Sequence, residues 1–185
     1  MARLLLTFTV LLVGCQYMTD NSNEIQIDTP EGEVFATDTA GSTAPQDITV
    51  VTGDDLAWLQ TLGQIGPEFV QHYLSDVDEP TLMDYDNAFR MWQNDESSVF
   101  SDQQVMETLG GYIGNKCVAD LGMEWSVVVD EYGTDYAVRS AETEVASYPF
   151  SAVLKRIEDR QNGFIHGLYH TIRYTIETAR SKQRE

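Results

Sequence analysis

The sequence predicts an α+β fold, with helices at the N-terminal side, a small antiparallel sheet of two to three strands, and further helices at the C-terminal end. Between about residues 56 and 121, apolar residues recur every three or four positions, which is the period of an amphipathic helix. Between about residues 124 and 147, apolar and polar residues alternate, which is the period of a strand. The helical period returns from Pro149 to the end of the chain.

Residues 1–15 have the composition of an export signal. Arg3 supplies a positive charge, and a short apolar run follows it and ends in small residues before Cys15. The run is too short to span a membrane, because a spanning helix takes about 20 residues. A positive start, a short apolar segment and a small-residue end are typical of a secretory signal peptide.

The end of this run reads Leu12-Val13-Gly14-Cys15. It resembles the lipobox of a bacterial lipoprotein signal sequence; an ordinary cleaved signal peptide is the alternative. The resemblance implies cleavage before Cys15, lipid on its thiol, and a diacylated or triacylated N-terminus held stably at a bilayer. Gln16, rather than Asp, follows the cysteine. This implies the periplasmic face of the outer membrane in a Gram-negative cell, or the outer face of a single membrane.

We therefore expect a signal peptide at residues 1–14, a lipidated acidic tether at 15–50, and a single α+β domain at 51–185. The tether is rich in small, polar and acidic residues, and such a segment buries too little apolar surface to offset the entropy of ordering it. Repulsion between its acids extends it. A brief strand over residues 33–36 is the one element predicted within it.

The chain is strongly acidic, with a formal net charge of −19 at pH 7 and no Lys or Arg between Arg3 and Arg90. Such a charge repels nucleic acid and anionic lipid headgroups. Two interpretations stay open: attraction to a cationic partner, and solubility in a salty or acidic habitat, where screening weakens the repulsion. Only two cysteines exist, so a lipidated Cys15 leaves Cys117 without a disulfide partner.

The folded part is expected to begin near Val50. Asp54 and Asp55 suit the N-cap and first turn of a helix, where acids are favourable. Gly66-Pro67 predicts a break, after which Pro67 begins a second helix. The apolar residues of these two helices are Leu56, Leu59 and Leu62, then Phe69, Val70, Tyr73 and Leu74.

A third and a fourth helix precede the sheet. The fourth starts with a capping-box pattern, Ser101 followed by Gln104, and Gly122 is placed to end it. The apolar residues of the two helices are spaced three or four apart: Leu82, Tyr85, Phe89 and Trp92, then Val105, Leu109, Ile113, Cys117 and Leu121.

The sheet and the last helices follow. Alternating residues predict strands over 125–129 and 136–138, with a third over 144–147. Pro149 suits the first turn of a helix. The final helix, residues 164–182, has an apolar stripe made of Ile165, Leu168, Tyr169, Ile172, Ile176 and Ala179.

Several short stretches carry a resemblance to a known domain: Leu109-Gly110, Ile113-Gly114, Gly122-Met123-Glu124-Trp125, Asp130-Glu131-Tyr132-Gly133, Tyr148-Pro149-Phe150-Ser151 and Lys155-Arg156-Ile157-Glu158. Over roughly residues 95–180, about half the chain, the sequence resembles a small bacterial family catalogued only as a domain of unknown function. The resemblance implies a compact α+β unit in helix–strands–helix order. It implies no activity and no catalytic residue.

Two histidines and one cysteine are the candidates for chemistry. His166 and His170 are four residues apart and share a helix face, a spacing that can bind a transition metal with Glu177 as a distant oxygen donor. A solvated polar face beside the apolar stripe is the alternative. Cys117 is a candidate nucleophile with a histidine as base, but it lies on an apolar stripe, where free cysteine packs as a small hydrophobe.

Three further groups have a structural and a functional interpretation. Gly110, Gly111 and Gly114 permit close packing within the domain or a groove for a partner. An acidic cluster offers oxygen ligands for calcium but lacks the EF-hand glycine and glutamate, so a solvated loop is the alternative. Its members are Asp76, Asp78, Glu79, Asp84 and Asp86. The aromatic residues suited to a core or an interface are Trp92, Trp125, Tyr132, Tyr136 and Tyr148.

The sequence therefore favours an envelope lipoprotein of unknown activity whose domain binds another protein or a cell-wall component. We predict no catalytic residue, no cofactor and no metal. One alternative is an enzyme or metal-dependent module that uses Cys117 or the His166/His170 pair. Another is an inhibitor or immunity-type protein that captures a cationic partner through the acidic half of the chain.

Overall fold

The computed structural model describes residues 24–29, 32–37, 46–131 and 133–184. The predicted signal peptide, the lipobox with Cys15, and Gln16 lie outside these residues. In chain order the elements are β1 (Glu24–Thr29), β2 (Gly32–Thr37), β3 (Asp47–Val50), α1 (Gly53–Tyr73), α2 (Leu82–Gln93), α3 (Asp102–Leu121), β4 (Glu124–Asp130), β5 (Gly133–Arg139), β6 (Ala146–Ser147), α4 (Pro149–Glu158) and α5 (Ile165–Lys182).

The main sheet has four antiparallel strands in the order β3-β4-β5-β6. This confirms the α+β class. The sheet has one strand more than the two to three predicted over about residues 124–147, because β3 joins it from an earlier part of the chain. The fourth strand, β3, lies at 47–50, a stretch that the sequence assigns to the tether. Three of its four residues are exposed, so its own pattern carries little strand signal, and pairing with β4 decides its conformation.

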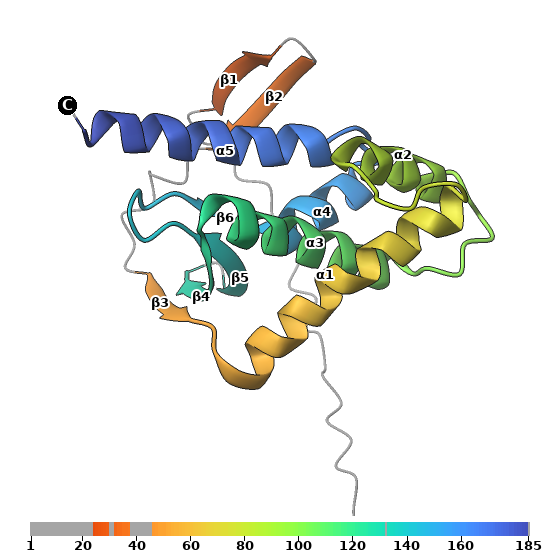
Figure 1. The fold of residues 1–185 in the computed structure, drawn as a ribbon, viewed down its shortest axis with the longest axis horizontal. Helices are drawn as coiled ribbons and strands as arrows, with labels where there is room; N and C mark the ends of the chain where they lie inside the picture. Colours follow the sequence, from red (N-terminus) through yellow and green to blue (C-terminus); the bar gives the residue numbers. More distant parts are fainter. Residues whose placement is uncertain (1–23, 30–31, 38–45, 132, 185) are drawn as a thin grey trace, which may run out of the picture.

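A separate hairpin precedes the sheet. Strands β1 and β2 pair antiparallel with each other, and β2 contacts α5 (Figure 1). The brief strand predicted over residues 33–36 lies within β2. The acidic stretch before the domain therefore contains more regular structure than its composition indicates.

Helix α1 runs without a break from Gly53 to Tyr73, with Pro67 inside it. The predicted division into two helices is wrong. The contacts between α1 and α3 outweigh the local preference of proline, because tertiary packing routinely overrides helix propensity. The helices are so close that a Cβ on Gly63 would lie 2.3 Å from the Nδ2 atom of Asn115. Thr52, rather than Asp54 or Asp55, is the N-cap residue.

Helix α3 lies at the centre of the domain and contacts α1, α4, α5 and the sheet (Figure 1). Its predicted capping box, Ser101 with Gln104, is confirmed, and so is its end at Gly122, which has a φ of 67°. The predicted α2, α4 and α5 are also present, and α5 begins at Ile165. In the part of the chain that the structure describes, no helix is long and apolar enough to cross a membrane.

The three glycines of α3 are positions of close packing within the domain. A Cβ on Gly110 would lie 2.5 Å from the Phe150 ring, and one on Gly114 would lie 2.0 Å from the Trp125 ring. Gly111 faces α1 in the same way. Other residues of this chain therefore occupy the space beside each of the three glycines, which leaves no groove for a partner at these positions.

Candidate functional site

Cys117 is enclosed in the core, with an exposed fraction of 0%. Burial raises the pKa of its thiol to about 12. The charge of Asp120 adds to this increase, and the charge of Lys116 opposes it. The thiol is therefore protonated at neutral pH, whereas a nucleophilic cysteine reacts as the thiolate. The position fits packing and does not support catalysis by Cys117.

His166 and His170 lie together on α5, with their ring centroids 4.3 Å apart. The side chain of Glu177 interacts instead with Arg173, whose Nε lies 2.8 Å from Glu177 Oε1. Among the described residues, no group of three or more His, Cys, Asp or Glu side chains is arranged to hold a metal ion. The structure thus brings the two histidines together without adding Glu177 to them.

The five acids weighed as possible calcium ligands, all within the described residues, form no group that could hold a metal ion. Asp84 accepts a hydrogen bond from the Thr81 backbone N–H in a capping box at the start of α2. Asp86 lies within the domain, 5% exposed, where it accepts hydrogen bonds from the backbone N–H groups of Ile165 at 2.7 Å and His166 at 3.0 Å. Asp86 therefore caps α5, a role that the sequence did not indicate.

The aromatic candidates divide between the core and the surface. Trp125 is 2% exposed and belongs to the core. Tyr136 and Tyr148 are half-buried, and Tyr132 lies outside the described residues. Trp92 lines a surface pocket.

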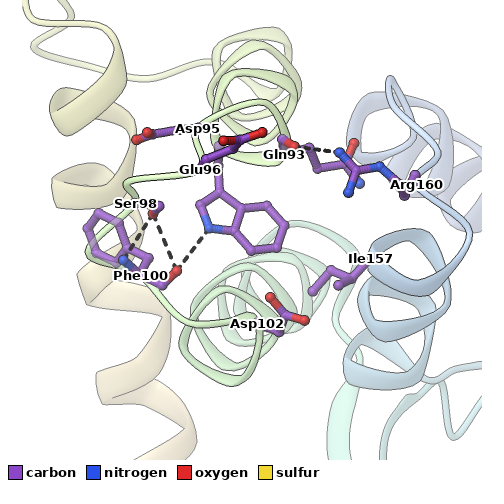
Figure 2. A pocket seen from close by; sticks show the side chains of 9 residues that line it. Gln93, Asp95, Glu96, Ser98, Phe100, Asp102, Ile157 and Arg160 are labelled. Atoms are coloured by element: carbon purple, nitrogen blue, oxygen red, sulfur yellow. Dashed lines mark hydrogen bonds between the residues drawn. The ribbon is translucent and has the colours of Figure 1, made fainter.

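This pocket has a volume of about 380 Å³ and lies where the end of α2, the α2–α3 loop and the end of α4 meet (Figure 2). Trp92 is one of its lining residues, and the indole Nε1 of Trp92 donates a hydrogen bond to the Phe100 carbonyl at 3.0 Å. The Ser98 hydroxyl lies 2.8 Å from that of Tyr73, which links the loop to α1. These bonds fix the loop, so the pocket is formed before any ligand arrives. Its lining residues are Trp92, Gln93, Asp95, Glu96, Ser98, Phe100, Asp102, Ile157 and Arg160.

Three of the lining residues are acids and one is a base. Hydrogen bonds from the Ser97 hydroxyl and backbone N–H lower the pKa of Asp95, so this carboxyl group is ionised at neutral pH. The Arg160 guanidinium donates to the Gln93 carbonyl at 2.8 Å and is held at one side of the pocket (Figure 2). The excess of carboxylates makes the pocket suited to a positively charged group.

Sequence reasoning did not identify a pocket between α2 and α3. The available signal is the succession Asp95-Glu96 and then Asp102, three acids around a turn that follows Trp92. The contribution of α4 had no signal, because Arg160 is far from the loop in sequence and reaches it only through the packing of the helices.

Comparison with curated proteins and with solved structures finds no match. Comparison with protein families finds one match, at residues 84–169, to a family described as a domain of unknown function, DUF3806. The matched range includes the whole pocket lining and overlaps most of the expected range of 95–180. The match runs from α2 to the start of α5, and the family that it identifies is described only as a domain of unknown function.

Proposed function

We propose that this protein is a lipid-anchored protein of the cell envelope whose domain binds a cationic segment of a partner protein and performs no chemistry itself. The observation that carries the binding role is the preformed pocket around Trp92, with Asp95, Glu96 and Asp102 in its wall. Carboxylates in a concave site raise the local concentration of cations and speed their association.

The burial of Cys117 supports a binding role over an enzyme that uses this thiol. Nucleophilic catalysis needs an activated side chain, and the thiol of Cys117 is buried and protonated instead. The anchor proposal rests on the resemblance of residues 12–15 to a lipobox. An anchored domain with an acidic surface would hold a cationic partner close to the membrane while being repelled by anionic headgroups.

The binding role is tested with the full-length protein in a non-ionic detergent as bait for an envelope extract. We expect a partner that is retained at 50 mM NaCl and largely lost at 500 mM. The double variant E96Q/D102N should retain less of it. The matched control D78N/E79Q, which removes two exposed acids from the α1–α2 turn, should retain as much as the wild type. A partner insensitive to both salt and E96Q/D102N would contradict the proposal.

The anchor is tested separately by metabolic labelling with a palmitate analogue and by cell fractionation. We expect the wild type to carry the label and to sediment with membranes. The Cys15→Ser variant should carry no label and should appear in the soluble fraction. Wild-type protein without lipid would show that residues 1–15 act as an ordinary signal peptide.

A further inference from the structure

A second surface of the domain exposes aromatic rings. Trp58 on α1 is 42% exposed, although tryptophan is mostly buried in folded proteins. Its ring centroid lies 5.7 Å from that of Tyr136 on β5, and the two ring planes meet at 52°. Phe150 on α4 supports both rings, with centroid distances of 6.4 Å to Trp58 and 6.2 Å to Tyr136. We call Trp58, Tyr136 and Phe150 the aromatic corner.

The core does not require Trp58 at this position. The residues that α1 buries include Leu59 and Leu62 but not Trp58. On α4, Leu154 is 39% exposed one helical turn after Phe150, which extends the apolar surface beyond the rings. Accessible aromatic side chains that lie together, as Trp58 and Tyr136 do, are typical of a binding site.

The surroundings of the aromatic corner are acidic. Asp55 lies three residues before Trp58, on the same side of α1, and its charge, after burial, raises the pKa of Tyr136. Asp135 accepts hydrogen bonds from the Ser151 hydroxyl and from the backbone N–H of Tyr136. Helix α1 contains no lysine or arginine. The other two elements that carry the rings do hold bases, Arg139 on β5 and Lys155 and Arg156 on α4, and Arg156 lies over the Phe164 ring.

We propose that the aromatic corner binds a lysine or arginine side chain of the partner's cationic segment, with the charged group against Trp58 and near Asp55. Cations are attracted to the faces of aromatic rings, and most strongly to tryptophan. The alkyl part of such a side chain would cover Leu154.

This inference rests on the proposed function and extends it along one helix. Helix α4 carries Phe150 at its start, and Ile157 near its end lines the pocket. Its ten residues span about 15 Å, which an extended peptide covers with about five residues. One cationic segment can therefore place a basic side chain in the aromatic corner and another in the pocket.

The probe is a ten-residue peptide of alternating Lys and Gly, with Gln in place of Lys in the control peptide, titrated into the full-length protein in a non-ionic detergent. We expect the Lys peptide to bind and the Gln peptide not to bind. Trp58→Ala should weaken binding about three- to thirty-fold, and Asp55→Asn should weaken it in the same direction. Tyr174→Ala, which removes a ring that is 59% exposed on α5, should leave the affinity unchanged.

An NMR measurement on the wild type avoids any loss of folding in the variants. The indole N–H groups of Trp92 and Trp125 are bonded to Phe100 and Asn115, and Trp58→Phe identifies the third indole signal. The Lys peptide should shift the Trp58 signal. A Trp58 signal that does not shift when the peptide is added would overturn the inference.

The two proposals fail in different ways. Normal affinity in Trp58→Ala and Asp55→Asn, with weakened affinity in E96Q/D102N, would overturn the aromatic corner and leave the pocket intact. Equal binding of the Lys and Gln peptides to the wild type would overturn recognition of positive charge at both sites.

Discussion

At the scale of single residues, Asn115 joins three elements. From α3, its Nδ2 donates to the Leu59 carbonyl at 2.9 Å and the Gln60 carbonyl at 3.3 Å, both in α1. Its Oδ1 accepts a hydrogen bond of 2.9 Å from Nε1 of Trp125 in β4. The side chain thus satisfies a buried indole and holds α1 at the distance at which Gly63 contacts it.

We predict that Asn115→Ala lowers the free energy of unfolding by about 1–3 kcal/mol, because it leaves the indole N–H of the buried Trp125 without its partner. Urea denaturation measures the change. Gln103→Ala is the control, since it removes a hydrogen bond to Glu107 on the exposed face of the same helix, and it should change stability by less than about 0.5 kcal/mol. Equal effects of the two substitutions would contradict the role of Asn115.

At the scale of elements, α5 depends on another helix for its start. Its own N-cap residue, Phe164, makes no side-chain cap hydrogen bond, and Asp86 from α2 binds the first N–H groups instead. Tyr169 adds a second tie through a hydrogen bond of 2.8 Å to Asp120 on α3. Helix α5 is therefore positioned by carboxylates that belong to its neighbours.

This cap predicts a pH dependence. Burial raises the pKa of Asp86 above its ordinary value of 3.8, and the backbone hydrogen bonds oppose this only in part. The folded state therefore holds this proton more tightly than the unfolded state, so the contribution to stability is full below pH 3.8 and is lost as the pH rises through the folded-state pKa. Unfolding measured from pH 4 to 7 should show the stability of the wild type falling relative to Asp86→Asn.

Asp84→Asn is the control for this measurement, with the opposite sign. Hydrogen bonds from Thr81 lower the pKa of Asp84. The advantage of the wild type over this variant should therefore be present above the ordinary pKa and be lost as the pH falls below it. Parallel pH profiles for the two variants would show that burial of Asp86 has no energetic effect.

The proline inside α1 gives a second prediction for an element. Pro67 has no N–H to donate to the carbonyl four residues earlier, and proline costs about 3 kcal/mol in a helix interior. Pro67→Ala should raise the free energy of unfolding by about 1–3 kcal/mol, after a small opposing gain in the entropy of the unfolded chain. Thermal and urea unfolding measure this. Pro80→Ala, in the turn before α2, should give no such gain, and a destabilised Pro67→Ala would mean that its ring packs favourably.

Elements with a strong apolar period were predictable, and elements decided by distant contacts were not. Ser101 and Gly122 mark the ends of α3 in the sequence, and the structure places them there. Strand β3 and the continuity of α1 depend on pairing with β4 and on contacts with α3, which no local pattern records. The same holds for the pocket, since Trp92 and Arg160 come from helices whose packing brings them together.

At the scale of the whole molecule, the formal net charge of −19 opposes compaction. Salt screens repulsion between exposed charges, with a screening length of about 10 Å at 0.1 M. We predict that raising NaCl from 10 to 500 mM at pH 7 increases the unfolding temperature by about 2–4 °C, corresponding to about 1 kcal/mol.

The control for the salt experiment is the same titration at pH 4. Near this pH, carboxyl groups with ordinary pKa values of about 4 are roughly half protonated, so the net charge is small and the salt effect should disappear. An equal effect at both values of pH would indicate specific ion binding or salting-out rather than screening.

The burial of Cys117 has a consequence for how the motions of this domain can be followed. A thiol with 0% exposure and a pKa of about 12 escapes alkylating reagents and oxidants as long as α3 stays packed. Each modification of Cys117 then records one opening of the core, because the slow step is exposure rather than reaction. The rate at which that thiol is consumed therefore measures how often the packed core opens.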